Sequence, residues 1–152
     1  MRLTLDINVL VSAFIAKHGH PALLSELAMT LEGIQLVLSE TIPRELEDVL
    51  SRDEVRGRFT YAAKDIREIA GSIRRSAEIL RPKSKFKTVK DHPKDDVVLN
   101  TAHDGNADHI VSGDNHLLKL RKFRGIRIIN PKEMIDILGR SFPELIYDFQ
   151  EY

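Results

Sequence analysis

Two short apolar runs that each end in an aspartate constrain this chain more than any other feature of its sequence. Residues 2–5 lead to Asp6, and residues 109–113 lead to Asp114. Short apolar runs followed by helix-like patterns are typical of parallel strands. In an open parallel sheet, the pocket lies outside the carboxyl ends of the strands. We therefore expect the two carboxylates to converge at one edge of a sheet.

Strand-like and helix-like segments alternate along the rest of the chain. We expect strands at residues 2–6, 34–38, 79–80, 109–112 and 126–129. We expect helices after Asp6, from Pro21, after Ser39 as a cap, across residues 66–77, from near Asp95 and from Pro131. Gly33 and Gly139 are expected to end two of them. This alternation predicts a single three-layer α/β domain whose central, mainly parallel sheet has four or five strands flanked by helices.

The composition is that of one folded domain. The 152 residues are 42% hydrophobic, and no apolar stretch is long enough to span a membrane. The absence of cysteine excludes disulfides and thiolate metal sites. Asp6 interrupts the N-terminus before an export signal can form, so we expect a cytoplasmic protein. The 23 basic and 23 acidic residues cancel, so only their distribution along the chain is informative.

Four acidic residues stand where a sheet edge would bring them together: Asp6, Glu45, Asp95 and Asp114. Each alone has an ordinary explanation as a helix cap, a dipole partner or a turn residue. Glu45 is less ordinary, because it flanks the apolar stripe of its helix, and a half-buried glutamate is uncommon unless it is paired. Crowded carboxylates repel and tend to stay protonated unless a hard cation neutralises them. The set therefore predicts a site for Mg²⁺ or Mn²⁺.

Four segments of the chain resemble, in order, the acidic motifs of the PIN-domain ribonucleases. These are residues 6–13 (DINVLVSA), 39–50 with Glu45, 95–102 (DDVVLNTA) and 107–114 (ADHIVSGD), and the strand, proline and helix around Pro131 are also similar. The resemblance covers about residues 2–139 and is nearest to the branch described as toxins of toxin–antitoxin pairs. It implies a nuclease domain at residues 1–139 and leaves residues 140–152 as an aromatic-rich tail.

The resemblance implies metal-dependent hydrolysis of RNA phosphodiester bonds, with an RNA substrate and a cognate antitoxin protein as partners. Asp6, Asp95 and Asp114 would hold one or two Mg²⁺ or Mn²⁺ ions, with Glu45 a ligand directly or through water. A bound ion lowers the pKa of a coordinated water and takes up charge on the phosphoryl oxygens. No separate protein base is then required.

Beside the four acids, Asn8 and Ser112 would orient a ligand or a phosphate, although Ser112 alone is better explained by a plain turn hydrogen bond. Two residues depart from the family pattern. Ile7 replaces a small hydroxyl residue, and His116 stands where a second acid often follows Asp114, so both departures bear on metal affinity. The histidines as a group are expected to be solvated or to pack rather than to form a ligand set.

Basic residues are concentrated between residues 74 and 90 in spite of the zero total charge. Within this stretch Arg81, Lys83, Lys85 and Lys87 are the candidate RNA-binding residues, because cations beside a carboxylate cluster offset its repulsion of phosphates. Such a run is more often a solvated face. Phe86, in its middle, would either stack a base or anchor a flexible loop.

Two other functions fit part of the pattern. A phosphatase of the haloacid-dehalogenase type also begins with an apolar strand and Asp-x-Asp, and has a serine at the end of strand two. Asn8 lacks the carboxylate needed there for proton transfer, Leu118 stands where an acid is needed, and Glu45 and Asp95 are left unexplained. A non-catalytic PIN-like module that binds RNA or a protein is the second alternative, and His116 is the only indication for it.

The last twelve residues hold four of the chain's nine aromatic residues, which are six Phe and three Tyr. Leu145, Ile146 and Phe149 fall at helical spacing and give one apolar face. Burying one large apolar side chain is worth roughly 1.5–3 kcal/mol, so this face is expected to be covered. It either packs as a closing helix on its own domain or forms the contact of a homodimer.

Overall fold

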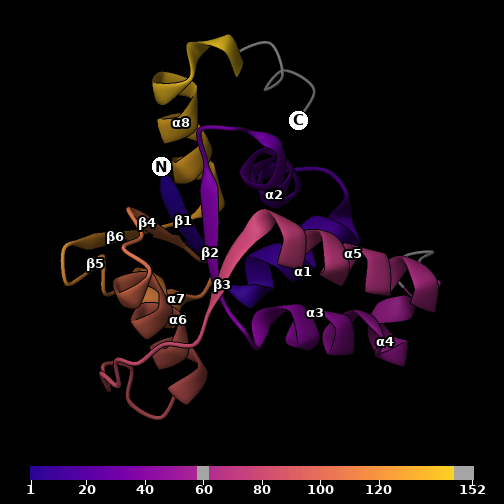
Figure 1. Ribbon diagram of the computed structural model, residues 1–152, viewed down its shortest axis with the longest axis horizontal. Helices are drawn as coiled ribbons and strands as arrows, with labels where there is room; N and C mark the ends of the chain where they lie inside the picture. Colours follow the sequence, from indigo (N-terminus) through magenta and orange to yellow (C-terminus); the bar gives the residue numbers. More distant parts are fainter. Residues whose placement is uncertain (58–61, 146–152) are drawn as a thin grey trace.

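The structure, a computed structural model, describes residues 1–57 and 62–145 and is built around one six-stranded sheet (Figure 1). The strands, in their order across the sheet, are β3 (Ala77–Leu80), β2 (Gln35–Ser39), β1 (Arg2–Leu5), β4 (His109–Val111), β6 (Ile126–Ile129) and β5 (Lys122–Phe123). All neighbouring strands are parallel except β5, which pairs antiparallel with β6. The strand order reverses beside β1, and open parallel sheets form their ligand pockets at such a position.

Helices cover both faces of the sheet and bury a separate apolar core on each (Figure 1). The larger core lies under α1 (Ile7–Ala16), α2 (His20–Thr30), α3 (Ile42–Leu50), α5 (Ala63–Ser76) and α8 (Pro131–Ser141), and α4 (Asp53–Arg56) adjoins α3. The smaller core lies under α6 (Pro93–Asp104) and α7 (Asn115–Leu118). Leu5 and Leu36, in the central strands, have no exposed surface, as expected for parallel strands that are buried on both faces.

The predicted class, a three-layer α/β domain with a mainly parallel sheet, is confirmed, but the sheet has six strands instead of four or five. The additional strand, β5, is two residues long and pairs only at the edge with β6. The four-residue helices α4 and α7 were not predicted either. Elements this short contain no complete period of apolar residues, so the sequence pattern does not reveal them.

Gly33 and Ser39 do not mark the helix end and the helix start that the sequence predicted. α2 ends at Thr30, before Gly33 is reached, so the glycine does not end the helix. A Cβ at Gly33 would lie 2.5 Å from the Phe142 ring, so the glycine is needed for that ring to pack. Ser39 does not cap α3, because it ends β2, and its hydroxyl lies 2.9 Å from that of Thr41, the N-cap residue.

The C-terminal residues pack partly on the domain itself. α8 runs past the predicted end at Gly139 as far as Ser141, and Phe142 and Leu145 beyond it pack against the larger core. Leu145 is only 7% exposed. The other two residues of the predicted apolar face, at positions 146 and 149, lie outside the described residues. No helix in the described ranges is both long and apolar enough to cross a membrane.

Candidate functional site

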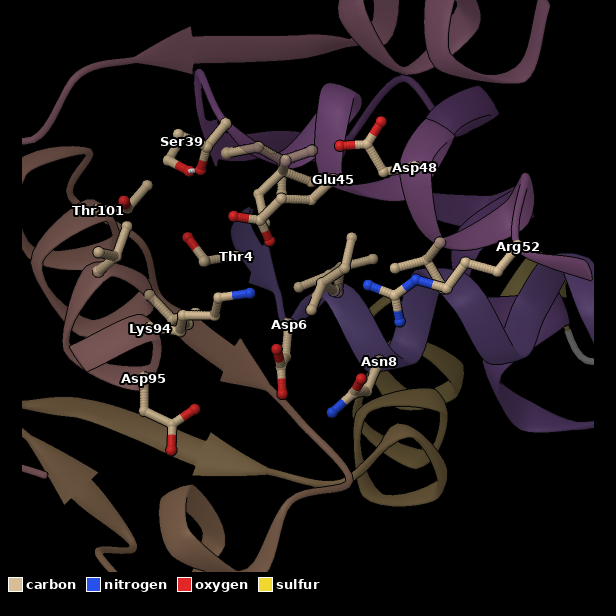
Figure 2. Close-up of a pocket in the computed structure, with 18 residues that line it drawn as sticks. Thr4, Asp6, Asn8, Ser39, Glu45, Asp48, Arg52, Lys94, Asp95 and Thr101 are labelled. Carbon is tan, nitrogen blue, oxygen red and sulfur yellow. Dashed lines mark hydrogen bonds between the residues drawn. The ribbon is translucent and has the colours of Figure 1, made fainter. Parts of the chain in front are cut away.

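A cavity of about 460 Å³ opens at the carboxyl edge of the sheet, beyond the ends of β1 and β2 and between α3 and α6 (Figure 2). Asp6 reaches it from the end of β1, Asn8 from the first turn of α1, Glu45 from α3 and Asp95 from the first turn of α6. Parallel strands all end at one edge, so the segments that follow them begin around the same space. For this reason Asp6, Asn8, Glu45 and Asp95 line one pocket.

Asp6 is the most buried acid of the cavity, at 3% exposure. Its backbone N–H donates to the carbonyl of Val111, 2.9 Å away, and the Ser112 hydroxyl donates to its Oδ2 at 2.8 Å. Burial raises the pKa of Asp6, the Ser112 hydrogen bond lowers it, and the charges of Asp95 and Asp114 raise it further. The three carboxylates are therefore close enough to repel, and a cation among them would remove this repulsion.

Asp114 lies in a smaller adjoining pocket that Asn8 also lines. Ser112, which has no exposed surface, links Asp114 to Asp6, because its oxygen accepts from the Asp114 N–H at 3.0 Å while its hydroxyl donates to Asp6. Asp114 also caps α7, since its Oδ1 accepts from the His116 N–H at 2.8 Å, and this hydrogen bond is the main reason that its pKa is lowered. Ser112 thus makes the expected turn hydrogen bond and also contacts a site acid.

Two histidines lie beside this cluster, close enough to Asp95 to offer ligand atoms together with it, an arrangement that was not expected from the sequence. The rings of His92, just before α6, and His116, in α7, have centroids 4.1 Å apart. With Asp95 they offer ligand atoms that all lie within 4.8 Å of one another. Burial and the charge of Asp114 raise the pKa of Asp95, whereas both histidines lower it. No spacing rule reveals this pair, because only the fold brings the starts of α6 and α7 together.

Glu45 and two cations complete the cavity. Glu45 is half-buried, as predicted, and its carboxylate points into the cavity from α3 (Figure 2). Figure 2 shows Lys94 extending into the same space, with its ammonium group between Glu45 and Asp6 in this view, and Arg52 at the other end. Neither cation was predicted from the sequence. The place of Lys94, directly before Asp95 at the start of α6, was the available signal.

An extended segment, residues 83–89, runs antiparallel to α6 and is bound to it at three points. Asp104 accepts from the N–H groups of residues 83 and 84, Asn100 exchanges two hydrogen bonds with the backbone of residue 86, and Asp96 accepts from residues 88 and 89. These three side chains follow one another at four-residue intervals, so they form one polar stripe on the helix. We call residues 83–89 the lysine segment.

The candidate RNA-binding residues occupy this segment and its approach. Lys83, Lys85 and Lys87 are exposed and alternate with partly buried residues, so their side chains leave the same side of the extended chain. Arg81, also exposed, has its Nε 3.5 Å from the carboxylate of Glu40. The segment therefore presents a row of cations whose backbone is held by α6.

Phe86 anchors the lysine segment, which was one of the two alternatives stated for it. Its ring packs edge-on against His103 and Phe123 in the smaller core, with centroid distances of 5.4 and 5.9 Å. The guanidinium carbon of Arg124 lies 4.0 Å from the centre of the same ring. The faces and edges of this ring are thus largely engaged within the protein.

Ile7, which with His116 departs from the family pattern, packs against the larger core.

An open, mainly parallel sheet with an acidic pocket at its carboxyl edge defines the class of this protein. Within that class, the family model of the PIN domain matches residues 2–116, which is more than half of the chain. The chain therefore belongs to the PIN-domain family. Proteins of this family are typically nucleases that use divalent metal ions, and the match gives no support to the alternative of a haloacid-dehalogenase-type phosphatase.

A chain of similar fold occurs in the crystal structure of VapBC2 from Rickettsia felis bound to a DNA fragment from their promoter. The two chains are 13% identical with a TM-score of 0.55, and the match covers 86% of this chain and 98% of that one. At this identity the similarity is one of fold. No curated protein matches the chain.

Proposed function

We propose that this chain is a metal-dependent endoribonuclease that hydrolyses RNA phosphodiester bonds. The observation that carries the proposal is the convergence of Asp6, Asp95 and Asp114, because burial and the repulsion between these carboxylates make Asp6 and Asp95 costly to keep ionised. Groups perturbed in this way concentrate at functional sites, and a cluster of carboxylates suits a hard divalent cation. Membership of a family of nucleases supports the reaction class.

Asp6, Asp95 and Asp114 would hold Mg²⁺ or Mn²⁺, with Glu45 a ligand directly or through water. The donors fit these ions, because carboxylate oxygens are their preferred protein ligands and a cation would relieve the repulsion that raises the pKa of Asp6. When bound, such an ion supplies an activated water near neutral pH and neutralises charge on the phosphoryl oxygens.

The other residues of the site position the substrate and the ligands. Ser112 fixes the two aspartates that it contacts through its two hydrogen bonds. Lys94 and Arg52 place positive charge inside the cavity, where they would bind phosphate oxygens next to the scissile bond. Asn8, which lines both pockets, would donate its amide to a phosphate oxygen or to a metal-bound group.

RNA would approach the cavity along the lysine segment. This segment leads from the end of α6 back to its first turn, where Asp95 lies, and Arg81 stands two residues before the segment. An extended chain advances about 3.3 Å per residue, so alternate side chains such as Lys83 and Lys85 lie about 6.6 Å apart. A row of cations at this spacing suits the charged backbone of a single strand.

We further propose that the protein is the toxin of a toxin–antitoxin pair, acts in the cytoplasm and is held by a cognate antitoxin protein. The resemblance over about residues 2–139 is nearest to that branch of the family. The fold is shared with a chain of the Rickettsia felis VapBC2 structure. A homodimer is proposed as the assembly, with the tail as its contact.

Incubating the purified full chain with labelled single-stranded RNA and Mg²⁺ or Mn²⁺ tests the proposal. Internal cleavage that requires the ion and stops on chelation supports it. A phosphomonoester is the control substrate and should stay intact. If RNA and metal bind but no bond breaks with any divalent ion, the protein is the non-catalytic binding module instead. In crystals soaked with Mn²⁺, anomalous density should touch Asp6, Asp95 and Asp114, and density elsewhere would contradict these ligands.

A further inference from the structure

Two histidines at the rim of the acidic cluster have no role in the function proposed above. His92 is the N-cap residue of α6, but its side chain makes no capping hydrogen bond. His116 lies in α7, and its ring is tilted by 35° against that of His92 at a centroid distance of 4.1 Å. Two imidazoles held together in this way either pack against each other or bind a common ligand, and their surroundings distinguish the two.

The surroundings favour a ligand. The His116 side chain is 47% exposed, so stacking removes little apolar surface from water and stabilises the pair weakly. A carboxylate, Asp95, joins the two rings, and one ligand atom from each of the three residues lies within 4.8 Å of the others. A divalent ion bonded at about 2.0–2.2 Å to each ligand would hold these atoms roughly 3–3.5 Å apart, so small adjustments of the side-chain rotamers would bring them into range.

Asp114 orients His116 as metal-binding imidazoles are usually oriented. Its Oδ1 lies 3.0 Å from the His116 Nδ1 and also accepts from the His116 backbone N–H at 2.8 Å. A carboxylate that engages one ring nitrogen fixes the ring and leaves the other nitrogen, Nε2, to face an ion. This contact uses Oδ1 of Asp114 and so does not occupy its Oδ2.

We propose that His92 and His116 are nitrogen ligands of the site and that they make it prefer a first-row transition ion that favours nitrogen ligands, such as Co²⁺ or Zn²⁺, to Mg²⁺. This inference deepens the proposed function and rests on it for the role of the ion in RNA cleavage. Imidazole suits transition ions, whereas Mg²⁺ favours oxygen ligands and keeps several of its waters. The histidine at position 116 therefore replaces an acidic ligand with one of different selectivity.

Calorimetric titration of the full chain with Co²⁺ and with Mg²⁺, together with the Co²⁺ absorption spectrum, tests the proposal. The wild-type protein should bind Co²⁺ more tightly than Mg²⁺. His92→Ala and His116→Ala should each weaken Co²⁺ binding by roughly tenfold or more and alter the spectrum, with a smaller effect on Mg²⁺. His116→Asp should shift the preference back towards Mg²⁺. His18→Ala, at an exposed histidine after α1, is the matched control and should change neither affinity.

Nuclear magnetic resonance of the wild-type protein labelled with ¹⁵N-histidine gives a readout that does not depend on the folding of a variant. Saturation with Zn²⁺ should shift one ring nitrogen of His92 and one of His116 and leave His18 in place. Unshifted resonances of the first two, or wild-type Co²⁺ affinity and spectra in both alanine variants, would overturn the inference.

The RNA cleavage assay keeps this inference apart from the proposed function. If the protein cleaves RNA but its imidazoles do not bind the ion, the proposed nuclease function is supported and the nitrogen ligands are contradicted. If the imidazoles bind the ion but the protein cleaves no RNA, the nitrogen ligands are supported and the proposed nuclease function is contradicted.

Discussion

At the scale of single residues, the fold treats the three site aspartates differently. Burial and mutual repulsion raise the pKa values of Asp6 and Asp95, whereas hydrogen bonds from His116 lower that of Asp114. A raised carboxyl pKa means that the group favours folding only while protonated, and this contribution is lost as the pH rises through the folded-state pKa. At neutral pH without metal, the charges of Asp6 and Asp95 therefore weaken the fold, and that of Asp114 supports it.

Asp6→Asn, Asp95→Asn and Asp114→Asn should each abolish metal-dependent RNA cleavage, because each removes a proposed ligand. In chelator at neutral pH, the first two variants should keep or raise the Tm, and the third should keep or lower it. Glu45→Gln should reduce cleavage more mildly if the glutamate acts through water. Thermal unfolding in chelator measures the Tm of each variant, and RNA cleavage assays with the metal measure its activity. Wild-type activity in all four variants would contradict the nuclease proposal. Unfolding of Asp6→Asn would indicate that Asp6 has a structural role as a helix cap.

A histidine away from the site should set part of the acid sensitivity of the fold. Burial in β4 and the charge of Arg127 lower the pKa of His109 below its ordinary 6.5, with Asp108 acting in the opposite direction. Its Nδ1 has no hydrogen-bond partner among the described residues. The unfolded chain therefore takes up a proton before the folded one does, so stability is full above pH 6.5 and is lost as the pH falls from there through the folded-state pKa.

Replacing this histidine with glutamine should flatten the acid limb of the stability curve. Between about pH 7.5 and about pH 5.5, the Tm of His109→Gln should fall less than that of the wild type. His18→Gln, at an exposed site, should follow the wild-type curve. Parallel curves for all three proteins would contradict the assignment.

At the scale of elements, α6 serves the site in two ways. Its first turn carries Asp95, and its stripe of Asp96, Asn100 and Asp104 holds the lysine segment. Replacing Lys83, Lys85 and Lys87 together by glutamine should weaken RNA binding. It should also reduce the magnitude of the slope of log affinity against log salt concentration by roughly 2, because each of the three lost phosphate contacts of a single strand contributes about 0.7. A filter-binding series at several salt concentrations measures the slope.

The matched control for this triple variant lies on α5, which packs on the other face of the sheet. It is the triple glutamine variant of three exposed cations, Lys64, Arg67 and Arg74. This variant changes the net charge equally and should leave the slope unchanged. Equal slopes in the two triple variants would exclude the lysine segment from the RNA path.

The contact between the loop after α2 and the end of α8 predicts a second effect at this scale. Gly33→Ala should lower the stability by roughly 1–3 kcal/mol, because the added Cβ displaces the Phe142 ring from a packed position. In the background of Phe142→Leu, the same substitution should cost less. Urea denaturation of the two single variants and the double variant gives the coupling. Additive losses would show that the ring does not limit this position.

At the scale of the whole molecule, the C-terminal residues belong to the domain at least as far as Leu145. Truncation after Gly139 removes Phe142 and Leu145 from the larger core and should destabilise the protein by roughly 1.5–3 kcal/mol for each large side chain lost. Truncation after Leu145 should leave the fold intact. Light scattering on this shorter chain then tests the homodimer: conversion of a dimer to a monomer supports the tail contact, and a full-length chain that is monomeric at high concentration excludes it.

The sequence by itself determined the fold class and the meeting of the acids. The alternation of apolar strands with helical stripes is a local pattern, and parallel strands must end at a common edge. Asp6 and Asp114 therefore face one region of space whatever lies between them, and Asp95 follows from its place at a helix start. Glu45 was predictable because helical periodicity already placed it beside the buried stripe.

Only the tertiary structure decided which side chains surround those acids. His92 and His116 meet because α6 and α7 begin at the same edge, and Lys94 enters the cavity through the direction of the first turn of α6. Gly33 faces Phe142 rather than ending a helix. Each of these contacts depends on how distant segments pack, and the two-residue β5 and four-residue α7 are too short to leave a periodic trace. Local periodicity determines which elements form, and the packing of distant elements determines which of their side chains meet.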